Sequence, residues 1–255
     1  MKKYSTDLDD LQWQIIEKIQ KDQRVRKHSL KSIWNAIFYI TKSGCQWRML
    51  PDSFPPWQTV YYYFRKWKRE GLIEQVHDML VIKIRISSGK KETPSVGIID
   101  SQSVKTTSIA GESRGYDAGK KTKGRKRHII VDTMGLLLAV VVHSADIQDR
   151  DGAKLVMENL RYRYFSIVKI FADGGYAGQL IEYVKGAFNW ILEIVKREGN
   201  DFKILPKRWI VERTIGWFNN YRRNSKDYEY LTETSEAIIQ LAMIRIMLNR
   251  KNLKN

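Results

Sequence analysis

Apolar residues recur at helical spacing over residues 1–86 of this chain. Leu11, Ile15 and Ile19 follow one another every four positions, which marks one face of a helix. A second run of the same kind covers residues 30–40 and is followed by Gly44, a residue typical of helix C-terminal caps. The pattern therefore predicts that the chain begins with an all-α region.

A third helix is predicted from Trp57 to Glu70, because two prolines precede it and a glycine follows it. Its expected core face consists of Val60, Phe64 and Trp67. Its other side carries four cations: Arg65, Lys66, Lys68 and Arg69. Three helices with a basic last member are typical of a helix-turn-helix-like DNA-binding unit. A plain helical bundle with a solvated basic face is the open alternative.

Short apolar runs replace the helical spacing after a polar segment at residues 87–95. They predict five strands, at 96–100, 128–132, 136–142, 168–173 and 190–195. Helices are predicted at 149–165, 176–188, 206–223 and 235–250. This order predicts an α/β fold with a mixed five-stranded sheet and helices, which is also the order of a ribonuclease H-like fold. We therefore expect a helical domain at 1–86, a linker at 87–95 and a catalytic domain at 96–255.

The charge of the chain narrows the class of partner. The 255 residues include 45 Lys and Arg against 28 Asp and Glu, a formal net charge of +17. A polyanion would relieve the self-repulsion, so nucleic acid is the first candidate and a membrane surface the second. Cys45 is the only cysteine, which excludes an internal disulfide and a cysteine-based zinc site. Because no signal peptide or long apolar span is visible, we expect a cytoplasmic, nucleoid-associated protein.

Two aspartates end predicted strands, and the ends of strands in α/β sheets are where sites form. Asp100 follows the first strand and Asp173 the fourth. Two carboxylates in close quarters favour a cation between them, and Mg²⁺ prefers such oxygen ligands. Either aspartate alone could instead cap a turn. Glu212, on the helix at 206–223, is a third candidate ligand, with a surface ion pair to Arg208 as the alternative.

Basic residues lie close to these acids in the sequence. The segment 120–128 holds six cations, which we expect to contact a DNA backbone, although a solvated loop is the alternative. We predict four more contacts around Glu212. The expected DNA-binding residues of this region are Lys120, Lys121, Lys123, Arg125, Lys126, Arg127, Arg208, Arg213, Arg222 and Arg223. Asp146, Asp149 and Asp151 form another acidic group, for which helix capping is expected and metal binding is the weaker alternative.

Taken together, several motifs resemble bacterial insertion-sequence transposases of the DDE class, in the IS-five group. They are residues 44–51 (GCQWRMLP), 54–57 (FPPW), 99–105 (IDSQSVK), 115–120 (GYDAGK), 124–128 (GRKRH), 172–176 (ADGGY), 208–214 (RWIVERT) and 225–229 (SKDYE). The resemblance covers nearly the whole chain. It implies a ribonuclease H-like catalytic core preceded by an all-α helix-turn-helix-like domain, with Asp100, Asp173 and Glu212 as a triad that binds two Mg²⁺ or Mn²⁺ ions.

The resemblance also implies an activity and partners. The protein would bind the terminal inverted repeats of a mobile element, cleave DNA at the element ends and transfer the 3′-hydroxyl strands into target DNA by two-metal-ion phosphoryl transfer. A homodimer or larger assembly on double-stranded DNA is expected. The related insertion-sequence-four pattern places Tyr, Arg, Glu and Lys around the last acid. Here Arg208 and Glu212 match, whereas Leu205 and Asn219 replace the Tyr and the Lys.

Three alternatives to a transposase remain open from the sequence. A DNA-binding regulator would use the same helices and charge without catalysis. A nuclease of the same fold would hydrolyse DNA and never join it. A degenerate transposase would keep the fold and lose the activity, although the three acids of the triad are all present.

Overall fold

The computed structural model describes residues 3–22, 24–108, 110–111, 113–195, 207–250 and 253. The chain divides into two compact units. We call residues 1–90, 218–225 and 237–255 the helical unit, and residues 91–217 and 226–236 the sheet unit. The predicted boundaries at 86 and 96 stay a prediction, since this division assigns two later segments to the helical unit.

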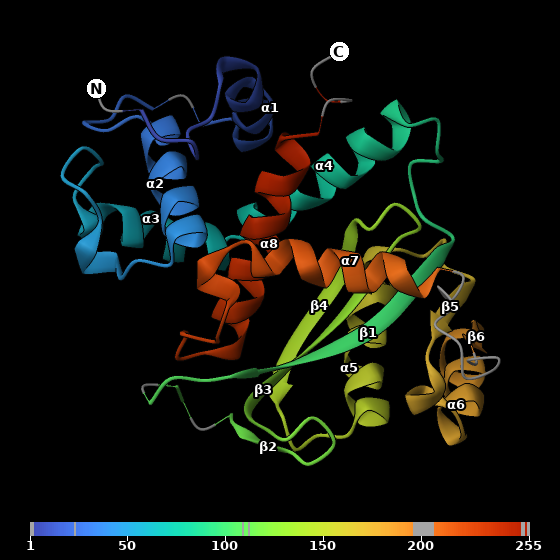
Figure 1. Ribbon diagram of the computed structural model, residues 1–255. Helices are drawn as coiled ribbons and strands as arrows, with labels where there is room; N and C mark the ends of the chain where they lie inside the picture. The colour runs from blue at the N-terminus through green and yellow to red at the C-terminus, as the bar shows by residue number, and fades with distance from the viewer. Residues whose placement is uncertain are drawn as a thin grey trace. The chain divides into compact units, whose positions relative to one another are not determined.

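The helical unit begins with four helices (Figure 1). They are α1 (Asp10–Gln20), α2 (Leu30–Ser43), α3 (Trp57–Arg69) and α4 (Leu72–Ser87), with a short 3₁₀ helix η1 (Trp47–Met49) before α3. Ser29 caps α2 through its hydroxyl, and Gly44 ends the helix in the left-handed region with φ of 72°. Helix α3 buries Val60, Phe64 and Trp67, the face that its sequence predicts.

Helix α1 forms where the spacing predicts a helix, but the apolar face with Leu11, Ile15 and Ile19 is not the face that it buries. The helix buries Gln12 and Ile16, whereas Leu11 remains 52% exposed. The Gln12 amide donates to the carbonyl oxygen of Leu248 at 2.9 Å, so a polar side chain occupies an interior position with a partner. The predicted face of α1 instead lines an apolar groove of about 790 Å³ beside α4.

The sheet unit contains six strands among its described residues (Figure 1). They are β1 (Val96–Lys105), β2 (Gly115–Asp117), β3 (Thr122–Val131), β4 (Leu137–Ser144), β5 (Lys169–Ala172) and β6 (Ile191–Ile194). The order is β2-β3-β1-β5-β6, with β4 paired to β3. Strand β1 runs antiparallel to β3 and parallel to β5. The short strand β2 is the one that the sequence did not predict.

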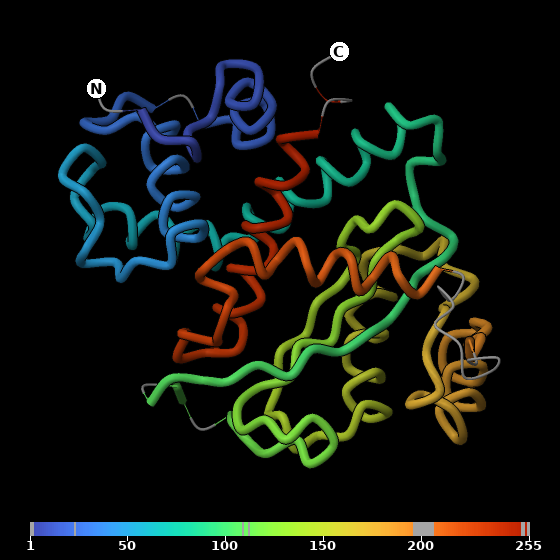
Figure 2. Tube along the Cα trace, viewed as in Figure 1, coloured from blue at the N-terminus to red at the C-terminus, as the bar shows by residue number. Residues whose placement is uncertain are grey.

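The basic segment at 120–128 largely belongs to β3, which starts at Thr122, six residues before the predicted strand. Cations at alternating positions disguise the strand in the sequence, because a strand is recognised by its apolar positions. The trace in Figure 2 shows β3 continuing beside β1 over their full paired length. Lys105 faces Gly124 at one end of this pairing, and Ile98 faces Val131 at the other.

Helices complete the sheet unit. They are α5 (Asp149–Arg163), the 3₁₀ helix η2 (Gly174–Tyr176), α6 (Gln179–Phe188) and the greater part of α7 (Arg208–Asn219). Helix α5 packs on β3 and β4, and α6 packs on β6. The remaining elements, η3 (Arg222–Asn224) and most of α8 (Thr232–Leu248), belong to the helical unit. As predicted, most of α8 is buried.

The strand order and the mixed pairing confirm an α/β fold with a ribonuclease H-like core that follows a helical region. Pro206, the expected first residue of the helix that carries Glu212, lies outside the described residues, as does Leu205. Within the part of the chain that the structure describes, no helix is long and apolar enough to cross a lipid bilayer.

Candidate active site

Asp100 and Asp173 occupy matching positions on neighbouring parallel strands. Ile98 of β1 lies opposite Phe171 of β5, so two residues further along the same register Asp100 faces Asp173. Asp173 directly follows β5, as the sequence predicts. Asp100 does not end its strand, because β1 continues to Lys105 along β3. Asp100 lies just past the last residue pair of the parallel pairing between β1 and β5. The sheet therefore has an edge at Asp100, although the strand itself does not end there.

The carboxylate of Asp100 is poorly compensated. Burial raises its pKa to about 6, against the opposing effect of a 2.7 Å hydrogen bond from the Ser101 backbone N–H. Lys120 and Arg208 lower the pKa through their charges, and Asp173 raises it. A carboxyl group with such a raised pKa marks a place where negative charge is not neutralised by the protein.

Asp173 and Glu212 meet through one guanidinium group. The Arg208 Nη2 atom lies 3.4 Å from Asp173 Oδ2 and 3.3 Å from Glu212 Oε1. Asp173 also accepts a 2.8 Å hydrogen bond from the Gly175 backbone N–H, which fixes its side chain at the start of η2. The Arg208–Glu212 pair that the sequence allowed as a surface alternative therefore exists, and it extends to the second aspartate.

The hairpin turn between β3 and β4 positions the helix that carries Glu212. The Thr214 hydroxyl donates to the carbonyl oxygen of Gly135 at 3.0 Å. Gly135 has φ of 78°, and a Cβ atom there would lie 2.8 Å from Thr214 Oγ1, so both the turn and the contact require glycine. Arg213 donates to the carbonyl oxygen of Met134 at 3.2 Å and lies between Trp209 and Trp217, with 4.5 and 4.7 Å to the ring centroids.

The three carboxylates fit a divalent cation by their chemistry. All their donor atoms are oxygens, as Mg²⁺ and Mn²⁺ prefer, and Asp100 keeps the raised pKa of a carboxyl group without a neutralising partner. Arg208 already bridges two of them and so provides a positive charge where a cation would bind. Among the described residues, no three acidic, His or Cys side chains lie close enough to hold a metal ion as they stand.

On the opposite face of β1, a second group of charges is fully paired. We call Ser101, Asp117, Lys126 and Asp149 the buried polar cluster. Lys126 Nζ lies 2.9 Å from Asp149 Oδ1 and 3.3 Å from Asp117 Oδ2. The Ser101 hydroxyl donates to Asp149 at 3.0 Å and accepts from the Lys120 ammonium at 2.8 Å.

Burial alone would raise the pKa of Asp117, but hydrogen bonds from Ser103, the Lys120 backbone and Lys126 outweigh it and lower this pKa to about 2. The period of two along β1 is the sequence signal for this cluster, because it places Ser101 and Ser103 on the face opposite Asp100. The predicted strand at 96–100 stops short of Ser101 and Ser103, so the apolar runs do not reveal this cluster.

Two histidines extend the buried polar cluster. His143 Nδ1 donates to the carbonyl oxygen of Ser144 at 2.8 Å, so its Nε2 accepts from His128 Nδ1, also at 2.8 Å. Burial, and then the neighbouring His143, lower the pKa of His128, which favours its neutral form. Gly152 of α5 packs directly on the rings, since a Cβ atom there would lie 2.4 Å from both.

Asp149 is not the N-cap of α5, which is Gln148 without a capping side chain. Its carboxylate instead accepts from Ser101 and Lys126. Asp151 pairs with Lys154 at the surface, and Asp146 accepts from Ser144. The three aspartates therefore have separate partners, and the capping expectation for Asp149 is wrong.

The expected DNA-binding residues fall into two sets. Four have buried side chains that contact protein groups: Arg125, Lys126, Arg127 and Arg223. Arg125 is 0% exposed and pairs with Asp227 at 3.2 Å. Burial with such partners leaves these side chains no free surface for DNA. The exposed or partly exposed residues are Arg65, Lys66, Lys68, Arg69, Lys120, Lys121, Lys123, Arg208, Arg213 and Arg222.

Comparison with known families assigns the chain. Residues 91–247 match the family model described as a transposase DDE domain. Residues 8–77 match the model described as a putative transposase of the IS4/5 family. No individual curated protein matches the chain at a significant level.

Proposed function

The chain belongs to the transposase DDE domain family, and we propose that it binds the terminal inverted repeats of a mobile element, cuts DNA at the element ends and joins the freed strands to target DNA. The observation that carries this proposal is the placement of three acids from β1, β5 and α7 around one edge of the sheet. Asp100 and Asp173 match in register, and Glu212 shares the Arg208 guanidinium with Asp173.

Transposase DDE domains generally use divalent metal ions. We propose that Asp100, Asp173 and Glu212 would hold two Mg²⁺ or Mn²⁺ ions, which supply charge stabilisation for the attacking and leaving oxygens. Arg208 would then leave the carboxylates and pair with a DNA phosphate, as a planar guanidinium does well. Exposed lysines such as Lys121 and Lys123 would hold the backbone, which offsets the repulsion between phosphate and the acids.

Both chemical steps balance without a cofactor that changes oxidation state. In cleavage, a water oxygen bonds to the scissile phosphorus, and the bond to the 3′ oxygen breaks, which leaves a 3′-hydroxyl and a 5′-phosphate. In transfer, this 3′-hydroxyl bonds to a target phosphorus, and the target's own 3′ oxygen leaves with the proton. One phosphodiester forms as another breaks, so no external energy is needed.

We propose that the helices of residues 1–86 recognise the element ends, with Arg65, Lys66, Lys68 and Arg69 of α3 on the DNA side. Two ends must be cut together, so a homodimer or larger assembly on DNA is part of the proposal. Inside a bacterial cell, such a protein would work on the nucleoid.

The test is cleavage of a labelled duplex that carries the DNA flanking the gene, with Mg²⁺ or Mn²⁺. Wild type should cut at the repeat end, and Asp173→Asn should bind without cutting. Asp151→Asn is the matched control, because Asp151 is an exposed aspartate whose partner is Lys154. Equal cutting by wild type and Asp173→Asn would show that the site lies elsewhere.

A second arm uses a pre-cut end and a supercoiled target plasmid. Joined products would support a transposase, whereas hydrolysis without joining would favour a nuclease of the same fold. Binding without cutting by wild type and both variants would favour a DNA-binding regulator or a degenerate transposase.

A further inference from the structure

A small basic pocket lies at the far end of β1, away from the acids. It has a volume of about 290 Å³ and is lined by Lys105, Thr106, Thr107, Ser108, Arg114 and Lys123. This size is near the lower end of ligand pockets, roughly 300 Å³, which suits one phosphate group better than a large cofactor. The lining contains three cations and three hydroxyl groups and no carboxylate.

The sheet register separates these cations into two sets. The pairing of β1 with β3 ends at Lys105 and Gly124, and extending its alternation by one residue on each strand puts Thr106 and Lys123 at opposed positions. Side chains of opposed residues share a face, and alternate residues on one strand do so too. Thr106 and Lys123 are therefore on the same face as Asp100, whereas Lys105 is on the other face.

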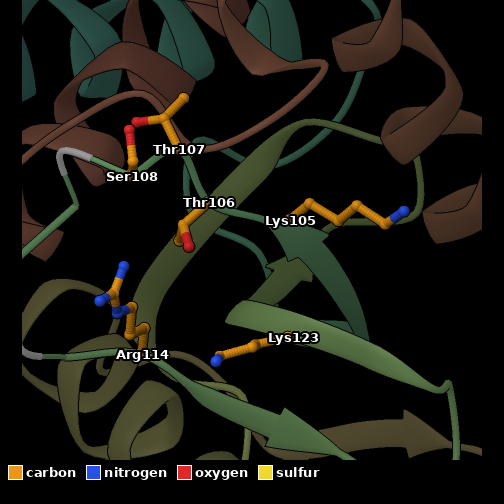
Figure 3. A pocket seen from close by; sticks show the side chains of 6 residues that line it. All are labelled: Lys105, Thr106, Thr107, Ser108, Arg114 and Lys123. Carbon is orange, nitrogen blue, oxygen red and sulfur yellow. The ribbon is translucent and has the colours of Figure 1, made fainter.

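Figure 3 agrees with this register. The Arg114 and Lys123 side chains end on the side of the Thr106 hydroxyl, and the Lys105 side chain points away from them. Arg114 reaches this face from the residue before β2, whose Tyr116 pairs with Lys123. Among the residues that the structure describes, neither Arg114 nor Lys123 forms an ion pair, so their charges are open to an external anion.

Backbone hydrogen bonds fix the segment that carries Thr106. The Asp227 backbone N–H donates to the carbonyl oxygen of Lys105 at 2.9 Å, and the Thr107 N–H donates to the carbonyl oxygen of Asp227 at 3.3 Å. The Asp227 carboxylate is itself held by Arg125 and by the Ser235 hydroxyl, at 3.2 and 2.8 Å. The buried Arg125 thus acts on the pocket indirectly, by fixing the segment that carries Thr106.

We propose that Thr106, Arg114 and Lys123 form a binding site for one backbone phosphate of duplex DNA, remote from the acids. Thr106 follows Asp100 by six residues on an extended strand, which spans roughly 20 Å. Duplex DNA rises about 3.4 Å per base pair, so this phosphate lies about six base pairs from the one that is cut. The inference rests on the proposed function and adds an anchor that sets the path of the DNA.

The test scans a neutral methylphosphonate linkage along the element-end duplex, from three to nine phosphates away from the cleavage position. Wild-type binding should weaken at one position near the sixth phosphate, roughly three- to tenfold. Lys123→Gln and Arg114→Gln should lose a similar factor in affinity for unmodified DNA. In these variants, a methylphosphonate near the sixth phosphate should cause no further loss of affinity. The slope of log K against log salt should fall by about one unit in Lys123→Gln.

Lys105→Gln is the matched control, because it removes a cation from the same strand end on the other face. It should bind DNA like wild type. The proposal would be overturned if Lys105→Gln and Lys123→Gln lost equal affinity for DNA. It would also be overturned if the losses of affinity from Lys123→Gln and from the methylphosphonate were additive. Thermal unfolding of each variant checks that these exposed substitutions leave the fold intact.

Free phosphate is the other source of the same chemistry. Inorganic phosphate at constant ionic strength should compete weakly and equally against wild type and Lys123→Gln. Two results together would assign the pocket to a free anion and overturn a DNA contact. Inorganic phosphate would stabilise wild type but not Lys123→Gln, and no methylphosphonate position would weaken DNA binding. If Lys123→Gln binds and cuts like wild type, the pocket proposal fails alone. If wild type neither binds nor cuts, the proposed function fails with it.

Discussion

Buried carboxyl groups on the two faces of β1 have pKa values shifted in opposite directions. On one face, burial raises the pKa of Asp100 to about 6, and Asp173 adds to that effect. On the other face, hydrogen bonds lower the pKa of Asp117 to about 2 although burial opposes them. The charges of the buried polar cluster are thus neutralised within the protein. We call the sheet edge with Asp100, Asp173 and Glu212 the acidic edge, and it keeps unmatched negative charge. Unmatched charge at a sheet edge is typical of a functional site, and matched charge of a structural one.

The largest expected effect comes from removing the unmatched charge. Asp100→Asn should lower the rate of DNA cleavage by about 10³-fold or more, because a carboxylate that holds a catalytic cation contributes several kcal/mol. DNA binding should persist. The measurement is single-turnover cleavage beside a binding titration. Retained cleavage in Asp100→Asn would remove the functional distinction between the two faces.

Breaking the buried polar cluster should affect stability more than any surface change. Lys126→Met leaves Asp117 and Asp149 without their shared cation, and loss of one partner of a buried pair costs about 3 kcal/mol. Urea unfolding measures this cost. Lys154→Met is the matched control, since its pair with Asp151 is exposed and should contribute about 0.5 kcal/mol or less. Similar losses in both variants would contradict the contrast.

The low pKa of Asp117 predicts a dependence of stability on acid pH. A carboxyl group with a depressed pKa in the folded state stabilises the protein above its unfolded value near 4, and this contribution is lost as the pH falls toward 2. The contribution is about 2 kcal/mol at neutral pH. The stability gap between wild type and Asp117→Asn should therefore narrow from pH 6 to pH 3. A gap that does not change with pH would argue against the ionised cluster.

The smallest expected effect concerns Arg208, the internal cation of the acidic edge. Arg208→Gln leaves Asp173 and Glu212 uncompensated, at a cost of about 1 kcal/mol or less because both carboxylates are partly exposed. Mg²⁺ should then raise the melting temperature of the variant more than that of wild type. Arg208→Lys, which keeps the charge, should fall between them. If Mg²⁺ raised the melting temperature of all three proteins equally, Arg208 and the ion would not compete for the same site.

Particular elements show how far sequence patterns reach. Helix α3 buries the three residues that its spacing predicts, because its apolar residues lie on one stripe. Helix α1 instead buries Gln12, whose hydrogen-bond partner is the carbonyl oxygen of Leu248, 236 positions away in the chain. The roles of Asp100, Asp173 and Glu212, predicted from strand ends and family motifs, remain a proposal that the register supports.

The sequence by itself determined the fold class, the family and the positive charge, because periodicity, motifs and composition are local or additive properties. Only the tertiary structure decided which charges are free. Arg125 and Lys123 look alike in one basic segment, yet Arg125 is sealed against Asp227 while Lys123 stays exposed beside a pocket. Whether a charge is neutralised depends on partners up to 102 residues away, and desolvation makes that partnership decisive for each side chain.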